Sequence, residues 1–306
     1  MIIEQLPNSI PFFVGEGLAT KLQGEALPEI VEVPTNDICY CKYECEYVEK
    51  VFADVGGEWY KNDKNSFLFK KLLSTDSITL KLYKAGIEIA TLNNNTYGTY
   101  YASFTAQPFY VGFVIEWEKV FNVSGFGRYQ VKAEISIVGT PSTYESQKFL
   151  LAPYTDISAN RTVRIECHQT GNIIGSEFDY TDLLPSGWYQ SYRIAGHFGL
   201  KEASIEVDNY LNQDYKLKQI QDKISHNYTL ETELLPSNIS NALVDDNLLS
   251  NRFYVTDYNF LNTELFRRVE LYPVEISEML NPNFSTKTKI IIKFTDKIDN
   301  LIKNNF

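Results

Sequence analysis

Several residue types and segments that mark particular protein classes are scarce or missing in this sequence. It has 2 methionines, 3 histidines and 4 cysteines in 306 residues. No apolar run approaches the ~18 residues that a membrane-spanning helix needs, so we expect no membrane partner. The stretch from Met1 to Pro7 has no basic segment followed by a long apolar run, so we expect no secretory signal. Without such a signal, the cysteines indicate a reducing compartment and free thiols.

Basic side chains are outnumbered, with 28 Lys and Arg against 39 Asp and Glu and a formal net charge of −11. An acidic surplus repels phosphate groups, which argues against a general nucleic-acid or anionic-membrane binder. A disordered chain is excluded because 44% of the residues are apolar and 14% are aromatic. The length suits two or three domains with a sizeable core.

The motifs of common nucleotide-dependent and hydrolytic enzymes are missing as well. The Gly15-Glu-Gly17 and Gly125-Phe-Gly127 sequences lack the third glycine of a dinucleotide-binding loop, so we interpret both as tight turns. Walker, His-Glu-x-x-His and Gly-x-Ser-x-Gly motifs do not occur. His197 lies between glycines with no evident base or nucleophile as its partner. The sequence therefore predicts neither an enzyme nor a cofactor.

The four cysteines leave a metal site open as an alternative. Cys39, Cys41 and Cys45 would lie on the same face of a strand, and Cys167 lies next to His168. The number of ligands therefore suffices for a zinc site with three cysteines and one histidine. Their spacing lacks the two cysteine pairs that make zinc ligation a strong prediction. Small buried thiols in a core are the favoured interpretation.

Acidic residues and aromatic residues in the middle of the chain allow another alternative. A glycoside hydrolase needs two carboxylates at a defined separation, and its sugar stacks on aromatic rings. The favoured interpretation is that the acids lie in solvated loops and the aromatics pack a β-sandwich. The residues concerned are Glu166, Glu177, Asp179 and Asp182, with Trp188, Tyr189 and Tyr192 as the platform.

Alternation of apolar and polar residues with a period of two dominates the chain. Residues 129–137 alternate in this way, which predicts a strand with one face on a core and the other in water. The same pattern occurs in residues 288–294 and in residues 163–168. In the last of these we expect Arg164 and Glu166 to face water.

Turn residues separate these runs at short intervals, as in Lys84-Ala85-Gly86. Short strands, tight turns and few helical stretches predict a mainly β protein with antiparallel β-sandwich or barrel modules and few short helices. Ser237 is expected to cap a helix at about 237–248, and residues 116–121 suit one or two helical turns. We interpret the ambiguous segment 209–225 as extended.

Composition divides the chain into three expected segments with soft boundaries. Residues 1–75 are rich in proline and glycine and suit an extended N-terminal arm with short strands that embraces a neighbour. Residues 76–200 have the densest alternation and resemble an immunoglobulin-like β-sandwich module in outline, without its Cys…Trp…Cys hallmark. Residues 201–306 are expected to form a C-terminal β module that contains the helix at about 237–248.

Seven runs between residues 105 and 306 form a recognisable pattern: Phe113–Val120, Gly125–Val131, Thr162–Glu166, Gly187–Gly196, Tyr228–Thr232, Val255–Asn259 and Lys293–Asn300. In this order they resemble virion structural proteins of tailed phages that infect Bacteroides-like bacteria. The resemblance is to the ring proteins of crAss-like phages, which belong to the head–tail connector or tail barrel.

The resemblance implies a non-enzymatic subunit that forms a homo-oligomeric ring around the DNA channel of a virion. Such a subunit would be made in the host cytoplasm and would contact adjacent connector or tail proteins or the portal. Acidic charge facing the channel would repel DNA, so that the genome passes through without specific binding. The alternative function is a carbohydrate-binding or receptor-binding, adhesin-like β-sandwich module.

Seven residues are our candidates for subunit contacts, because aromatic residues and arginine are typical of interface anchors. In the alternative interpretation, Trp188 and Tyr192 lie on the same face of a strand and point into a core, while Asp257–Asn259 form an ordinary turn. The candidates are Trp188, Tyr189, Tyr192, Arg193, Asp257, Tyr258 and Asn259.

Overall fold

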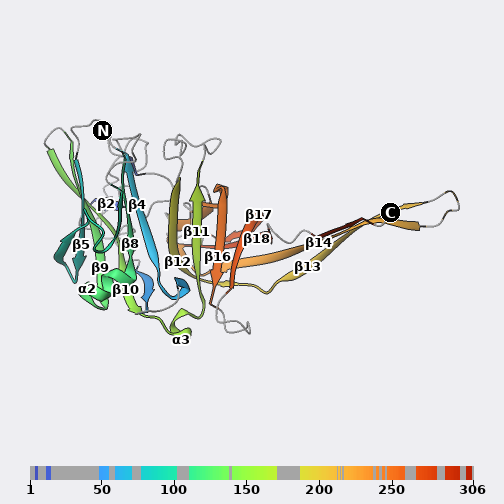
Figure 1. Cartoon of the computed structure of the whole chain (residues 1–306), viewed down its shortest axis with the longest axis horizontal. Helices are drawn as coiled ribbons and strands as arrows, with labels where there is room; N and C mark the ends of the chain where they lie inside the picture. The colour runs from blue at the N-terminus through green and yellow to red at the C-terminus, as the bar shows by residue number, and fades with distance from the viewer. Residues whose placement is uncertain are drawn as a thin grey trace.

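The computed structural model describes residues 4–5, 12–14, 48–54, 59–70, 77–101, 110–137, 140–170, 187–211, 213, 215, 217–236, 239–240, 243–244, 247–258, 267–280, 287–296 and 301–304. It confirms the prediction of a mainly β protein with antiparallel sheets and few short helices (Figure 1). Several sequence expectations fall on residues outside those described: Gly15, Gly17, Cys39, Cys41, Cys45, Glu177, Asp179, Asp182, Ser237 and Asn259.

Two sheets from the first half of the chain pack face to face on a shared apolar core, and we call them the N-terminal sheets. Phe67 and Phe113 from one sheet and Leu82 and Val131 from the other are fully buried there. The first sheet has the order β1 (Glu4–Gln5), β4 (Lys64–Lys70), β8 (Tyr110–Glu116), β7 (Gly98–Tyr101). The second has the order β2 (Phe12–Val14), β10 (Thr140–Pro153), β9 (Gly127–Ile137), β5 (Ser77–Lys84), β6 (Ile87–Thr91), with β3 (Val48–Ala53) parallel to β10.

Local patterns in these sheets follow the sequence predictions. In β9, Tyr129, Val131, Ala133 and Ile135 are buried while the residues between them are partly exposed. The turn that joins β5 to β6 has Ala85 at a φ of 49° and Gly86 at 84°. Two successive positive φ values match the twist of a hairpin, and they explain a glycine at this position.

Short helices lie at the ends of these sheets. The helix α2 (Trp117–Ser124) follows β8 directly, so the helical turns expected near residue 116 are present. Its Trp117 ring lies 4.9 Å from the ring of Phe149, between centroids, and is fully buried. A 3-10 turn, η1 (Trp59–Lys61), precedes β4, and α3 (Asp156–Ala159) leads from β10 into the second half of the chain.

The second half of the chain forms one antiparallel sheet that closes on itself, and we call it the closed sheet. Closure comes from β14 and β18, which pair between Tyr228 and Phe294, and an apolar core fills the interior. The order is β13 (Glu202–Leu211), β14 (Leu217–Thr232), β12 (Trp188–Phe198), β11 (Thr162–Gln169), β16 (Arg252–Asp257), β17 (Arg267–Leu280), β18 (Lys287–Asp296), β15 (Leu235–Pro236).

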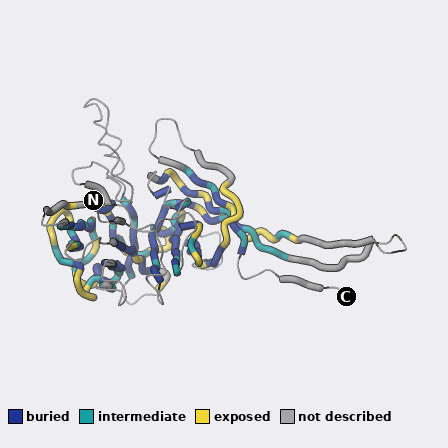
Figure 2. Tube along the Cα trace, turned by 90° about the horizontal axis from the view of Figure 1, so that it is seen from above, coloured by how far each residue is buried: buried dark blue, intermediate teal, exposed yellow. Residues whose placement is uncertain are grey.

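Strands β13 and β14 continue beyond the closed sheet as a long ribbon that projects from the body (Figures 1 and 2). We call this ribbon the arm. Its pairing extends from Glu202↔Asn227 to Leu211↔Leu217, and β19 (Leu301–Asn304) pairs with β14 along residues 221–224. The described residues of segment 209–225 include strand residues of both β13 and β14, in agreement with the extended interpretation.

Sheet pairing groups the strands differently from the three expected segments. Strands β1 to β4, in the expected N-terminal arm, complete the sheets formed by residues 77–153. Strands β11 and β12, in the expected middle module, belong to the closed sheet. In the expected helix at about 237–248, residues 239–240, 243–244 and η4 (Asn247–Leu249) have helical backbone. No helix of the described part is long and apolar enough to cross a membrane.

Candidate functional site

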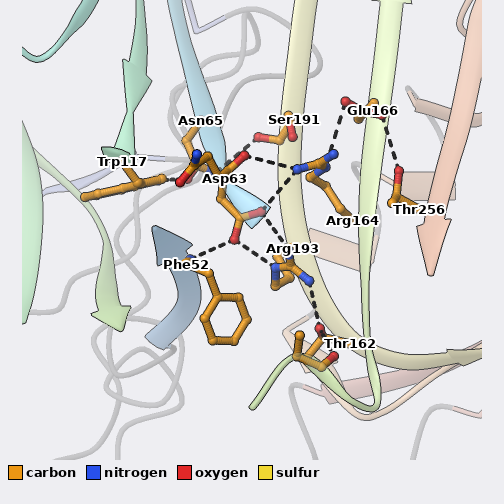
Figure 3. A network of polar contacts seen from close by, with 12 residues as sticks. Phe52, Asp63, Asn65, Trp117, Thr162, Arg164, Glu166, Ser191, Arg193 and Thr256 are labelled. Atoms are coloured by element: carbon orange, nitrogen blue, oxygen red, sulfur yellow. Dashed lines mark hydrogen bonds and ion pairs between the residues drawn. The ribbon is translucent and has the colours of Figure 1, made fainter. Parts of the chain in front are cut away.

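The outer face of the closed sheet meets the N-terminal sheets along β11 and β12, where β12 packs against β3 and β4. Charged and polar side chains from both sides are buried at this contact (Figure 3). We call this cluster the junction. Its members are Glu49, Asp63, Asn65, Arg164, Glu166 and Arg193.

An ion pair between Arg193 of β12 and Asp63, just before β4, forms the centre of the junction. Arg193 Nε donates to Asp63 Oδ2 at 2.8 Å and Nη2 donates to Oδ1 at 2.7 Å, which is a bidentate geometry. The guanidinium also donates to Thr162 Oγ1 at 2.9 Å and lies 4.2 Å from the Tyr258 ring centroid. The backbone N–H of Phe52 donates to Asp63 Oδ2 at 2.8 Å. Both charges are therefore compensated although they are buried.

Arg164 and Glu166 lie on β11 beside this pair, and their burial corrects the sequence expectation. Only 3% of Arg164 and 5% of Glu166 is exposed, whereas we expected both to face water. Alternation shows which face of a strand is polar, but the N-terminal sheets cover that face here. Arg164 Nη1 donates to the carbonyl of Asn62 at 3.1 Å and lies 3.6 Å from Asp63 Oδ1.

The carboxylate of Glu166 is held ionised by its neighbours. Burial opposes the charged form, but Arg164, Arg268 and the Tyr189 hydroxyl outweigh it and lower the pKa of Glu166. Arg268 Nε donates to Oε2 at 2.6 Å, and the Tyr189 hydroxyl donates to Oε1. Glu166 therefore is not a free acid for glycoside chemistry.

Glu49 of β3 is the one acid of the junction that receives only neutral donors in the described contacts. Its Oε1 accepts from the backbone N–H of Arg193 at 2.8 Å and from Asn65 Nδ2 at 3.1 Å. Its Oε2 accepts from Gln147 Nε2 at 2.5 Å. Burial, with a contribution from Asp63, outweighs these hydrogen bonds and raises the pKa of Glu49 to about 7.

Asn65 connects the junction to the core of the N-terminal sheets. Its Nδ2 also donates to the carbonyl of Ser191 on β12 at 3.1 Å, and its Oδ1 accepts from Trp117 Nε1 at 2.6 Å. The three contacts use donor and acceptor atoms of one buried amide. The arrangement supplies a polar connection between two sheet systems, and its carboxylates are all occupied by hydrogen bonds.

The expected subunit-contact residues lie mostly inside the chain. Trp188 packs against β8, where a Cβ added to Gly112 would lie 3.0 Å from its Cη2 atom. The Tyr192 hydroxyl accepts from Asn247 Nδ2 at 2.6 Å, and Asp257 pairs with Arg267 at 3.2 Å. The buried candidates are Trp188, Tyr192, Arg193, Asp257 and Tyr258, while Tyr189 is half-buried.

This burial corrects two sequence hypotheses. A side chain that its own chain covers has almost no surface left for a neighbouring subunit, so the five buried candidates do not serve as exposed anchors. For the same reason Trp188 and Tyr192 do not present ring faces to a sugar. Cys167 is 1% exposed in the core of the closed sheet, as the core interpretation expects. Within the described residues, no group of three or more His, Cys, Asp or Glu side chains is arranged to hold a metal.

Sequence reasoning missed Glu49, Asp63 and Asn65. They come from segments without a motif, and an isolated acid on a strand edge or in a turn has the same appearance in a sequence whether it is solvated or buried. Their partners lie far along the chain: Asp63 and Arg193 are separated by 130 positions and Glu49 and Arg193 by 144.

No protein-family model matches the chain, and no curated protein matches its sequence at a significant level.

Proposed function

We propose that the chain is a non-enzymatic structural subunit of a tailed-phage virion, one copy of a homo-oligomeric ring in the head–tail connector or tail. The observation that carries the proposal is the arm formed by β13 and β14, which leaves the body of the subunit (Figure 1). The resemblance of residues 105–306 to ring proteins of crAss-like phages supports the same assignment.

The arm suits contact with a second copy because three of its described apolar side chains are exposed. Ile205 on β13 is 61% exposed, Leu200 at its base 56%, and Tyr215 near its tip 87%. Beyond the residues that pair with β19, the arm has two strands. A two-stranded ribbon is marginally stable alone in water, so a neighbour that covers it would stabilise it. The outer edge of β13 pairs with no described strand, and such edges accept a further strand or a packed surface.

The closed sheet supports this role because it holds the base of the arm. Strand β14 runs from the closed sheet into the arm without interruption, so the direction of the arm is set by the closed sheet. A fixed direction is what a head-to-tail contact requires, because a ring closes only when each subunit is rotated by the same angle from the last.

The net charge of −11 fits a ring through which DNA passes. Repeated around a ring, the acidic surplus would repel phosphates and let the genome slide without specific binding. The partners would be adjacent connector or tail proteins or the portal, and the location would be the virion after synthesis in the host cytoplasm.

Shortening the arm tests the proposal. Residues 205–224 would be replaced by Asn-Gly, which closes a two-residue hairpin on the paired residues Ser204 and Ser225. Light scattering should give an assembly of many copies for the full chain and a folded monomer for the shortened chain. A shortened chain that assembles like the full chain, or a full chain that stays monomeric at every concentration tested, would contradict the proposal.

A further inference from the structure

Glu49 connects three strands through a single carboxylate. The donors are Asn65 on β4, Gln147 on β10 and the backbone of Arg193 on β12. Two of these strands belong to the N-terminal sheets and β12 belongs to the closed sheet. The side chain is 1% exposed, so water does not replace any of these contacts while the junction is closed.

The charged groups around Glu49 are already engaged elsewhere. The Arg193 guanidinium is paired with Asp63, and Arg164 donates to the carbonyl of Asn62. On α2, the Glu118 carboxylate accepts from the side chain of Asn62, and on β3 itself Lys50 donates to the carbonyl of Ser158. Lys148, next to Gln147 on β10, is exposed. Among the described ion pairs none includes Glu49, so its negative charge is buried without a paired cation.

A hydrogen-bond acceptor for the protonated carboxyl of Glu49 also lies at the junction. Gln147 Oε1 is buried and has no hydrogen-bond partner among the described residues, while its Nε2 donates to Glu49. Rotating this amide by half a turn exchanges the two atoms, so that Oε1 accepts from a protonated Glu49. Hydrogen bonding is therefore available to both protonation states of the carboxyl.

We propose that one proton on Glu49 controls how tightly the closed sheet is held against the N-terminal sheets, which makes the junction a pH-sensitive connection between the two halves of the chain. With the proton bound, the buried carboxyl is neutral and the three strands stay together. Without the proton, the unpaired charge favours hydration, and hydration requires β12 to separate from β3 and β4. The proposal does not depend on ring formation.

The direction and the size of the effect follow from linkage. The pKa of Glu49 is about 7 in the closed junction, against 4.5 for an exposed glutamate. Because the closed state holds the proton more tightly, the population of the open state rises with pH and levels off above pH 7. Between pH 6 and pH 8 the opening equilibrium should increase about tenfold.

Hydrogen exchange of the full chain at pH 6 and pH 8, corrected for intrinsic exchange rates, tests the proposal. The readout is protection of the Arg193 and Phe52 amides, which donate to Glu49 and Asp63. We expect protection to fall about tenfold at pH 8 in the wild type and to be independent of pH in Glu49→Gln. The control Glu134→Gln, at a partly exposed carboxylate 2.7 Å from Lys81 on the β5–β9 strand pair, should keep the wild-type dependence. Equal pH dependence in wild type and Glu49→Gln would overturn the proposal, as would protection that rises with pH.

A titration of the wild type covers the case in which Glu49→Gln does not fold. Carbon NMR of the glutamate side-chain carboxyls should show one group titrating near pH 7, together with the change in junction protection. If no glutamate titrates between pH 5.5 and pH 8, the proposal is wrong.

Discussion

Asp63 and Arg193, separated by 130 positions in the sequence, form a bidentate ion pair that joins the N-terminal sheets to the closed sheet. Their side chains are 3% and 1% exposed. A buried pair of this kind does not by itself make a protein stable, because desolvation of both charges offsets their attraction. Removing one partner is costly, however, because the other charge is then left buried and uncompensated.

The Asp63→Asn variant should therefore lower the free energy of unfolding by about 3–5 kcal/mol, as for other buried pairs that lose one partner. The matched control is Asp54→Asn, at a more exposed carboxylate 3.6 Å from Lys61, which should cost less than about 1 kcal/mol. Urea unfolding measures both values. Equal effects of the two substitutions would show that the junction pair is no more important than a surface pair.

Trp188 and Trp59 offer a second matched comparison, because Trp188 is 2% exposed and Trp59 is 55% exposed. Truncating a buried tryptophan removes its packing and leaves a cavity, so Trp188→Ala should cost about 3–5 kcal/mol of unfolding free energy. Trp59→Ala should cost clearly less. If Trp188→Ala left monomer stability unchanged and abolished assembly, Trp188 would be the subunit anchor that its burial argues against.

We expect the folded protein to lose stability in acid because of Glu166. Its pKa is lower in the folded chain than in the unfolded chain, so its contribution is present above the ordinary glutamate pKa and is lost as the pH falls through the folded value. Glu49 has the opposite effect on the pH dependence of stability. Its raised pKa makes the folded chain less stable as the pH rises from 4.5 to about 7. Denaturant unfolding of Glu166→Gln between pH 3 and pH 5 should give a flatter profile than the wild type. An unchanged slope would mean that Glu166 is not the group that titrates there.

Two exposed isoleucines, one on the arm and one elsewhere on the surface, test whether the arm makes the contact between subunits. Ile205 on β13 is 61% exposed and Ile157 on α3 is 84% exposed. If a neighbour covers the arm, Ile205→Ser should weaken the subunit contact about tenfold, because burying one aliphatic side chain contributes roughly 1.5 kcal/mol or more. Ile157→Ser should leave the contact unchanged. Sedimentation at a series of concentrations measures the contact, and the same shift for both variants would argue against the arm.

Much of the local structure could be predicted from the sequence, because local structure depends on neighbouring residues. Alternation identified β9 and β18, and the Ala85-Gly86 turn identified the hairpin between β5 and β6. The polar face of β11 was placed in water, since alternation separates polar from apolar faces and says nothing about what covers the polar one. Closure of the second sheet was beyond the sequence as well, because Tyr228 and Phe294 pair across 66 positions (294 − 228).

The junction could not be predicted for a related reason. Its acids and arginines compensate one another only after folding brings Glu49 and Asp63 beside Arg193. The candidates chosen as subunit anchors were aromatic and arginine residues. Those residue types are favoured in interfaces between chains, and contacts between domains of one chain resemble such interfaces. For Trp188 and Arg193, the structure shows that the contact is made within the chain.

Electron microscopy of the purified full chain at high concentration tests the central proposal most directly. The proposal predicts closed rings whose mass is a whole multiple of 35.2 kDa, with the β13–β14 arm of each subunit lying on its neighbour. Particles that remain single subunits, or rings in which every arm extends into solvent, would contradict it.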